Sequence, residues 1–258
     1  MNKLLEGKKG LVIGIANDHS IAWGITDNLC KEGAQVFLTY QNDAIKKRVD
    51  RLSQNIDCLG IFPCDVSSTD SIEKLKDSID TKIDFIVHAV AYSDKTELGG
   101  KYLDTSKENF LQTLHISAFS LTEITKIFMP LLNDNASIMA LSYYGAKKYM
   151  QSYNVMGVAK AALETSIKYL AVDMGDRGIR VNAISAGPMR TLAGAVIKKS
   201  RQIYSYTIKN SPIKKALTLD DVGKSAVYLV SDLSKGVTGE ILYVDNGYNK
   251  IGMSLEEV

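Results

Sequence analysis

Two side chains that could carry acid–base chemistry, Tyr153 and Lys160, stand seven residues apart in the segment Tyr153-Asn-Val-Met-Gly-Val-Ala-Lys160. Seven residues are close to two turns of an α-helix, so both side chains would share one face and could meet around one substrate. A free phenol has a pKa of about 10, and a nearby ammonium group favours the phenolate and brings that pKa closer to neutrality. The same ammonium could bind the hydroxyl groups of a nucleotide ribose. The chain has 13 tyrosines, so this spacing alone is weak evidence.

The elements expected to position these residues follow an alternating pattern. Short β-branched, apolar runs are separated by helix-length amphipathic stretches, which indicates right-handed β-α-β units. We therefore predict an α/β fold, a doubly wound Rossmann-type parallel sheet of about seven strands with helices on both faces. The strands are expected at residues 11–15, 36–39, 60–62, 85–88, 137–141, 181–185 and 241–244.

The bulk properties of the chain favour one domain over residues 1–258, because α/β folds of this size are commonly single units. Hydrophobic residues make up 45% and charged residues 23%, and 31 basic against 29 acidic residues leave a net charge of +2. This balance gives no case for nucleic acid or an anionic membrane as a partner. No apolar run is long enough for a signal peptide or a membrane span, so a cytoplasmic protein is expected. The scattered cysteines and histidines predict no metal site and reduced, mostly buried thiols.

A glycine turn that could hold a dinucleotide phosphate follows the first predicted strand. Gly14 ends that strand, and Ser20 and Ile21 begin an apolar-periodic helix that reaches Lys31. Backbone N–H groups at a helix N-terminus, together with the helix dipole, favour a pyrophosphate. The pattern is not G-x-G-x-x-G, so a simple tight turn at Gly14 and a plain N-cap at Ser20 are the alternatives.

Two further strand ends carry polar residues suited to the adenosine half of a dinucleotide. Gln41 follows the second strand, where a ribose-binding acid usually stands, and no Arg comes directly after it to receive a 2′-phosphate. This favours NADH over NADPH. Lys46, Lys47 and Arg48 lie further along, weaken that preference and are expected to form a solvated face. Asp65 follows the third strand and could accept a hydrogen bond from an adenine amino group, or could be a plain N-cap.

Taken together, these segments resemble the short-chain dehydrogenase/reductase family and, within it, the bacterial enoyl-acyl-carrier-protein reductases, over about residues 7–245. The motifs that carry the resemblance are Gly14-x5-Ser20-Ile-Ala-x-Gly24, Thr39-Tyr-Gln-Asn42, Leu141-Ser-Tyr-Tyr-Gly145, Tyr153-Asn-Val-Met-Gly-Val-Ala-Lys160 and Asn182-Ala-Ile-Ser-Ala-Gly-Pro-Met-Arg-Thr-Leu-Ala193.

The resemblance implies NADH-dependent reduction of the 2,3 double bond of enoyl thioesters on acyl-carrier protein, in the elongation cycle of fatty acid biosynthesis. It implies that Tyr153 hydrogen-bonds the thioester carbonyl, that Tyr143 is a second active-site tyrosine and that Lys160 binds the ribose. Ser93 matches a substrate contact. The positions that match cofactor contacts are Gly14, Ser20, Ile21, Gln41, Asp65, Val66, Val90, Lys160, Met189, Arg190, Thr191, Leu192 and Ala193.

Two departures from the family pattern concern the acyl pocket. Asp94, in the run Val90-Ala-Tyr-Ser-Asp94, puts a charge near the expected pocket mouth, and Ser200 stands where a Phe is frequent. Ser142 keeps a second activity open, since a strand-end serine is typical of 3-oxoacyl and other carbonyl reductases. A non-catalytic NAD-sensing module is a third alternative, against which Tyr153 and Lys160 argue.

The segment 188–212 is longer than a simple connection requires, which is typical of a substrate-binding lid. We expect Leu192, Val196, Ile197 and Ile203 to cover the acyl chain, while the basic residues face outward. A basic rim could dock the acidic acyl-carrier protein even at low net charge, although an ordinary solvated surface is the alternative. Proteins that resemble this one are commonly homotetramers. The residues of the expected rim are Lys198, Lys199 and Arg201.

Overall fold

The computed structural model describes residues 3–195 and 199–253 of the chain. Its centre is one seven-stranded sheet in which every neighbouring pair is parallel, in the order β3-β2-β1-β4-β5-β6-β7. The strands are β1 (Lys9–Ile13), β2 (Gln35–Tyr40), β3 (Cys58–Pro63), β4 (Ile83–His88), β5 (Leu132–Ser142), β6 (Arg180–Ala186) and β7 (Ile241–Val244). The predicted doubly wound parallel sheet is confirmed.

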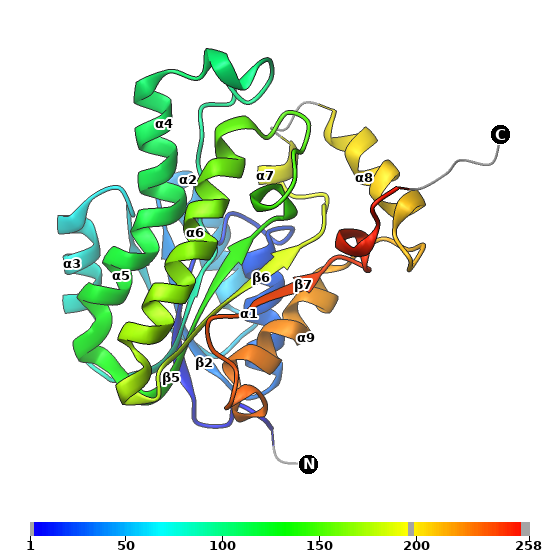
Figure 1. Cartoon of the computed structure of the whole chain (residues 1–258). Helices are drawn as coiled ribbons and strands as arrows, with labels where there is room; N and C mark the ends of the chain where they lie inside the picture. Colours follow the sequence, from blue (N-terminus) through cyan, green and yellow to red (C-terminus); the bar gives the residue numbers. More distant parts are fainter. Residues whose placement is uncertain (1–2, 196–198, 254–258) are drawn as a thin grey trace.

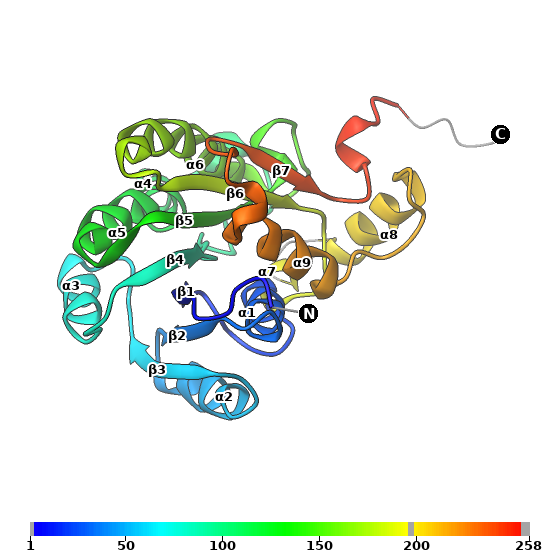
Figure 2. The same ribbon diagram turned by 90° about the horizontal axis from the view of Figure 1, so that it is seen from below.

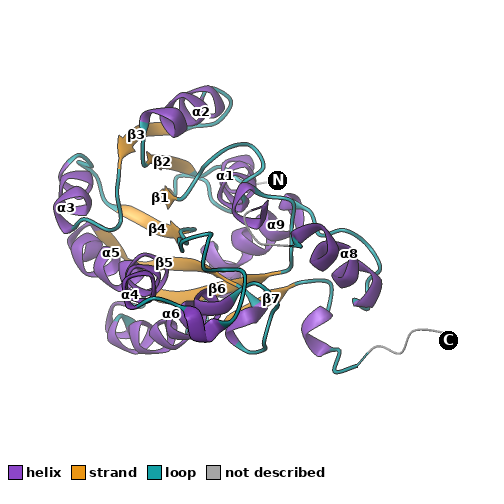
Figure 3. Cartoon of the chain, turned by 90° about the horizontal axis from the view of Figure 1, so that it is seen from above, coloured by secondary structure: helices purple, strands orange, loops and turns teal. Residues whose placement is uncertain are grey.

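Helices cover both faces of the sheet (Figure 3). One face carries α1 (Ile21–Lys31), α2 (Asp43–Ser53) and α9 (Leu219–Val230). The other carries α3 (Thr69–Asp77), α4 (Lys107–Leu114), α5 (Ser120–Phe128) and α6 (Asn154–Asp173), and a π-helical turn over His115–Phe119 joins α4 to α5. The view from below shows the same two layers on either side of the strands (Figure 2). Two short helices, α7 (Leu192–Ala195) and α8 (Ser200–Asn210), lie outside these layers beyond the end of β6 (Figure 1).

The apolar residues of each central strand alternate between two cores. In β4, Ile86 faces the α3–α5–α6 layer and Phe85 and Val87 face the α1–α9 layer, and all three are fully buried. Continuous apolar runs are required here because both faces of a parallel sheet are covered. Within the described part of the chain, no helix is both long enough and apolar enough to cross a membrane.

The first strand ends two residues earlier than the predicted boundary at Ile15. Gly14 has a φ of 110°, a conformation that L side chains rarely adopt, so the strand stops at Ile13. A Cβ atom at Gly14 would also lie 2.2 Å from the carbonyl oxygen of Ala89. The backbone therefore turns sharply at the carboxyl end of β1, against the end of β4.

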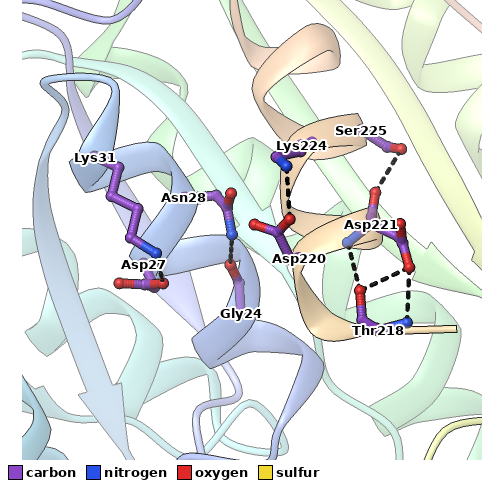
Figure 4. A network of polar contacts seen from close by, with 9 residues as sticks. All are labelled: Gly24, Asp27, Asn28, Lys31, Thr218, Asp220, Asp221, Lys224 and Ser225. Atoms are coloured by element: carbon purple, nitrogen blue, oxygen red, sulfur yellow. Dashed lines mark hydrogen bonds and ion pairs between the residues drawn. The ribbon is translucent and has the colours of Figure 1, made fainter.

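Helices α1 and α9 pack closely because glycines stand where they meet. A Cβ at Gly24 would lie 2.6 Å from the Cβ of Leu219, and a Cβ at Gly223 would lie 2.6 Å from the carbonyl oxygen of Gly24. Asn28, which is buried, donates to that same carbonyl at 2.9 Å (Figure 4). A capping box between Thr218 and Asp221 fixes the start of α9. The packing of α9 thus holds α1, and with it the turn that follows β1, in place.

Candidate active site

The residues expected to carry chemistry lie at the carboxyl ends of the strands, where open α/β sheets bind ligands. Tyr143 follows the last residue of β5, and Tyr153 is the N-cap residue of α6. Lys160 lies two turns into α6. The structure therefore brings the predicted catalytic residues to the end of β5.

The two tyrosine rings are in direct contact. Their centroids are 4.9 Å apart and the planes are inclined at 68°, an edge-to-face arrangement. Gly145 makes this contact possible, because a Cβ there would lie 2.5 Å from the ring of Tyr153 and 3.2 Å from the ring of Tyr143. Gly157 in turn lets α6 approach the carbonyl oxygen of Gly145. The segment Tyr143-Tyr-Gly145 thus packs directly against the ring of Tyr153. The need for a glycine at position 145 was not predicted from the sequence.

The acidity of the phenols differs from the expectation. Burial raises the pKa of Tyr153 well above its usual range, with a smaller effect in the same direction from Tyr143, and burial also raises the pKa of Tyr143. The prediction that a facing ammonium lowers the pKa of Tyr153 is therefore wrong for this structure. Tyr153 is 8% exposed, and removal from water is the largest cause of this shift. At neutral pH it is a protonated phenol and a hydrogen-bond donor.

Lys160 is 4% exposed, and its ammonium nitrogen donates to the backbone oxygen of Leu141 at 2.7 Å. Burial lowers its pKa to about 8, while the nearby carboxylate of Glu164 acts in the opposite direction. The lysine is therefore charged at neutral pH but close to losing its proton. Such a group can donate hydrogen bonds to ribose hydroxyls at the end of β5.

Ser142 does not face the tyrosines. Its hydroxyl donates to Oε1 of Glu164 at 2.7 Å, and both side chains are buried. Glu164 also lies 3.1 Å from the ammonium of Lys147, which belongs to the segment between the two tyrosines. Glu164 was not predicted as a functional residue, although its place four residues after Lys160 on a helix could have indicated a role.

The predicted phosphate-binding turn has a geometry that is compatible with a dinucleotide. Gly14 brings the backbone of β1 against that of β4 without a side chain between them, as a closely approaching nucleotide needs. Ser20 occupies the N-cap position of α1, but its hydroxyl donates to the backbone oxygen of Asn17 at 2.6 Å and does not cap the helix. The first turn of α1 contains no acidic residue, so its positive end faces no carboxylate from its own turn. These features fit the pyrophosphate of NADH.

The residues expected at the adenosine end lie at the ends of β2 and β3. Gln41 is exposed directly after β2, and Lys46, whose ammonium lies 5.6 Å from the ring centroid of Tyr40, is exposed on α2. The carboxylate of Asp65 accepts from the backbone and the hydroxyl of Ser67, at 2.9 and 2.7 Å. The N-cap of α3 is Ser68, so the alternative of Asp65 as a plain N-cap is wrong. Asp65 holds a tight turn after β3.

Two apolar residues among the predicted cofactor contacts lie at the ends of strands β3 and β4. Val66, after β3, is buried, and Val90, after β4, is partly buried against the core beneath α3 and α5. Ile21, the first residue of α1, packs on the opposite core. Their positions are compatible with close passage of a nucleotide.

The segment after β6 begins with a tight turn. The hydroxyl of Thr191 accepts from the backbone of Gly194 at 2.9 Å, and Met189 packs on the core beside α1. Arg190 is exposed and its guanidinium lies 4.9 Å from the ring centroid of Tyr204 on α8. A small pocket lies between α8 and the strand ends, lined by Gly187, Pro188, Tyr204, Thr207, Ile208, Ser211, Lys215, Leu217, Asp245 and Asn246.

The structure describes residues 188–195 and 199–212 of the predicted lid. Leu192 is 48% exposed, whereas Ile203 is partly buried. Of the basic rim, Lys199 and Arg201 are exposed, as expected for outward-facing residues. Ser200, the first residue of α8, is partly buried, and Ala193 belongs to α7. Val196, Ile197 and Lys198 lie outside the described residues.

The loop after β4 is tied to α4 and to the π-helical turn. Ser93 donates its hydroxyl to Oδ1 of the buried Asn109 at 3.2 Å, and the backbone of Asp94 donates to the same oxygen at 2.9 Å. Ser117, in the π-helical turn, accepts from the backbone N–H of Tyr92 and donates to its oxygen. The carboxylate of Asp94 is bound by Thr96, which lowers its pKa and fixes the charge within the loop. Asn109 and Ser117 had no sequence signal, because their contacts are made at long range.

Site and fold together define a class of protein. Strands β1 and β4 are neighbours, so the connections of the sheet leave in opposite directions between them, and that is where a dinucleotide binds. The Tyr–Lys helix at the next strand end places acid–base groups beside such a cofactor. This is the arrangement of a nicotinamide-dependent reductase of the short-chain dehydrogenase type. No group of three or more His, Cys, Asp or Glu among the described residues is arranged to hold a metal ion.

Comparison with known proteins narrows the class. The family model described as enoyl-(acyl carrier protein) reductase matches residues 14–249. Enoyl-[acyl-carrier-protein] reductase [NADH] 2 of Rhizobium meliloti is 52% identical, over 98% of this chain and 96% of its own, and the Rickettsia typhi enzyme of that activity is 51% identical, over 98% of both chains. This chain belongs to the enoyl-acyl-carrier-protein reductase family.

Solved structures of enoyl-acyl-carrier-protein reductases have the same fold as this chain. The enoyl-(acyl-carrier-protein) reductase of Anaplasma phagocytophilum in complex with NAD has a TM-score of 0.93 at 50% identity, covering 98% of this chain and 96% of its own. The Bacillus cereus enzyme with NADP+ and indole naphthyridinone has a TM-score of 0.95 at 39% identity, covering 97% of this chain and all of its own. The fold found here is therefore that of the family.

Proposed function

We propose that this protein reduces the 2,3 double bond of enoyl thioesters carried by acyl-carrier protein, with hydride from NADH, in fatty acid biosynthesis. The observation that carries the proposal is the pair of tyrosines at the end of β5, with Ser142 turned away from them toward Glu164. A protonated phenol at this place can donate a hydrogen bond to an oxygen on which negative charge develops. Family membership and high coverage by NADH-dependent relatives support the same reaction.

The reaction consists of hydride addition, stabilisation of an enolate and protonation of the α-carbon. When bound, NADH supplies the hydride that the β-carbon of the enoyl thioester accepts. Negative charge then develops on the thioester oxygen as an enolate, to which Tyr153 donates a hydrogen bond. Because burial keeps its phenol protonated, Tyr153 can make this bond without first gaining a proton. Protonation of the α-carbon, from solvent or through Tyr153, completes the reduction.

The remaining residues hold the reactants. Lys160 would bind the nicotinamide ribose, and the turn from Gly14 to Ile21 would bind the pyrophosphate. Tyr143 and Ser93 would contact the substrate. The other proposed cofactor contacts are Gln41, Asp65, Val66, Val90, Met189, Arg190, Thr191, Leu192 and Ala193.

A carbonyl reductase is the second candidate activity, because short-chain enzymes usually protonate an alkoxide. The strand-end serine that such an enzyme would use is buried and already donates to Glu164, which favours the enoyl reductase. NADH consumption with a 2-enoyl thioester and, in parallel, a 3-oxoacyl thioester tests the two. Turnover of the 3-oxoacyl thioester alone would overturn the proposal, and NADH binding without any turnover would support a sensor.

We propose that residues 188–212 form a lid over the acyl chain, within a single domain spanning the chain. The exposed Lys199 and Arg201, with Lys198, would offer a basic rim to acyl-carrier protein. The pocket between α8 and the strand ends supports the position of the lid.

We also propose a cytoplasmic homotetramer. Its support is the set of large apolar side chains on the outer face of α4, the π-helical turn and α6, where Leu111, Phe119, Tyr169 and Val172 are each more than half exposed. The free cysteines Cys30, Cys58 and Cys64 suit a reducing compartment. Light scattering should give four times the 28.3 kDa of the chain, and the mass of a monomer would contradict the assembly.

A further inference from the structure

Glu164 is a buried carboxylate that the proposed mechanism does not use. Its side chain is 1% exposed, one turn beyond Lys160 on α6. Removing a carboxylate from water costs several kcal/mol unless partners compensate. Here Ser142 donates to Oε1 at 2.7 Å and the Lys147 ammonium lies 3.1 Å from Oε2. An apolar residue could fill the same place without this desolvation cost. The presence of a charged residue here therefore indicates a function for the charge.

The partners of Glu164 belong to separate parts of the site. Ser142 is the last residue of β5, directly before Tyr143, and Lys147 lies in the segment that connects Tyr143 to Tyr153. Lys160 precedes Glu164 by four residues, so the two side chains are neighbours on the helix surface. One carboxylate thus contacts both flanks of Tyr143 and faces the ribose-binding lysine.

Lys160 needs such a neighbour because of its surroundings. It is buried and donates to the oxygen of Leu141, an uncharged partner. Burial lowers its pKa to about 8, and the charge of Glu164 opposes this. His88 on β4 faces Lys160 as a neutral ring, since burial, and to a lesser extent Lys160 itself, lowers its pKa to about 3. The other titratable groups around this cluster are Lys147, Tyr143, Tyr153 and Tyr243 of β7, whose pKa is raised by burial and then by Glu164.

We propose that Glu164 is a positioning residue for the reaction: its carboxylate keeps Lys160 charged for the nicotinamide ribose and clamps Ser142 and Lys147 on either side of Tyr143. This inference rests on the proposed role of Lys160 in cofactor binding. Glu164 touches neither substrate nor cofactor, and it acts through the residues it holds.

The test is the pH dependence of NADH affinity, measured by fluorescence titration, in wild type and E164Q. A lysine is charged below its pKa, so wild-type binding should weaken as the pH rises through about 8. E164Q keeps the size of the side chain but removes its charge, which lowers the pKa of Lys160. The weakening should therefore begin about one pH unit lower, and affinity should recover when the pH is lowered further.

K147M gives an independent variant with the opposite expectation. Lys147 is about half exposed, so a methionine fits at its position, and its loss leaves the charge of Glu164 unneutralised beside Lys160. The weakening should then begin at higher pH than in wild type. If E164Q does not fold, K147M is the deciding variant. A pH profile of NADH affinity in K147M that equals the wild-type profile would then overturn the proposal.

Further variants separate a positioning role from a structural one. In K160R the guanidinium stays charged, so its binding should be independent of pH and K160R/E164Q should add no shift. D220N, which removes an exposed carboxylate paired with Lys224 on α9, should reproduce the wild-type profile. Equal weakening of E164Q at every pH, or a profile that coincides with wild type, would overturn the role of Glu164. NADH affinity of K160M equal to wild type would instead overturn the proposed role of Lys160.

Discussion

At the scale of single residues, Tyr153 is a buried phenol for which we propose the role of hydrogen-bond donor. Burial raises its pKa, so the phenol holds its proton throughout the neutral range and can donate to an enolate oxygen. The seven-residue spacing to Lys160 indicated the pair, but it could not show how deeply both residues are buried. The spacing therefore predicted that both residues lie at one strand end, as they do, but it gave the wrong direction for the pKa of the phenol.

Removal of this phenol should affect turnover and leave cofactor binding unchanged. Y153F should lower kcat for an enoyl thioester by roughly 100- to 1000-fold, since one hydrogen bond to a developing oxyanion is worth about 3 to 4 kcal/mol. Its Kd for NADH should equal that of wild type. Y149F is the matched control, because Tyr149 is 85% exposed. Wild-type turnover in Y153F would remove Tyr153 from the mechanism.

At the scale of elements, the loop after β4 depends on one buried side chain. Asn109 on α4 accepts from Ser93, from the backbone of Asp94 and from Thr113, and donates to Glu97 at 3.2 Å. N109A should lower the free energy of unfolding by about 1 to 3 kcal/mol, because buried polar partners lose their acceptor. It should also raise the KM for the enoyl thioester while the KM for NADH stays the same. Asn55 is exposed, so N55A is the control. An equal rise in both KM values would show that this loop does not act specifically on substrate binding.

The close packing of α1 on α9 can be tested with a pair of glycines. A Cβ at Gly223 would meet Asn28 at 2.4 Å and the Gly24 backbone at 2.6 Å, so G223A should destabilise the protein by about 1 to 3 kcal/mol. Gly236 has nothing within 4 Å of such a Cβ, and G236A should stay within about 0.5 kcal/mol of wild type. Denaturant unfolding measures both. Equal stability of the two variants would contradict the close packing of α1 on α9.

The sequence predicted the elements better than the contacts between them. Seven strands were predictable because buried parallel strands are continuous apolar runs, and β7 (Ile241–Val244) has the predicted bounds. The early end of β1 follows from the conformation of Gly14, which an apolar pattern does not encode. Glu164, Asn109 and Ser117 were missed because each acts through partners that are brought together only by folding. Glu164 follows Lys160 by four residues, but the sequence does not show that this carboxylate is buried.

At the scale of the whole molecule, the exposed basic residues near the lid should matter only for the natural carrier. K199E/R201E, with or without K198E, should raise the KM for a carrier-linked enoyl substrate by roughly three- to tenfold, because like charges would oppose docking of an acidic protein. The KM for the corresponding CoA thioester should not change. K74E/K235E reverses exposed charges on α3 and after α9 and is the control. Equal effects on both thioesters would show that the rim does not dock the carrier.

The central claim is the transfer of hydride to a carbon–carbon double bond, and the fate of deuterium tests it most directly. The protein is incubated with NADH deuterated at the transferable position of nicotinamide C4 and, in parallel reactions, with a 2-enoyl thioester or a 3-oxoacyl thioester, and the products are examined by mass spectrometry and NMR. Deuterium should appear on C3 of a saturated acyl thioester, with a proton from solvent on C2. An unconsumed enoyl thioester, with deuterium found instead on the hydroxyl-bearing carbon formed from a 3-oxoacyl thioester, would contradict the assignment.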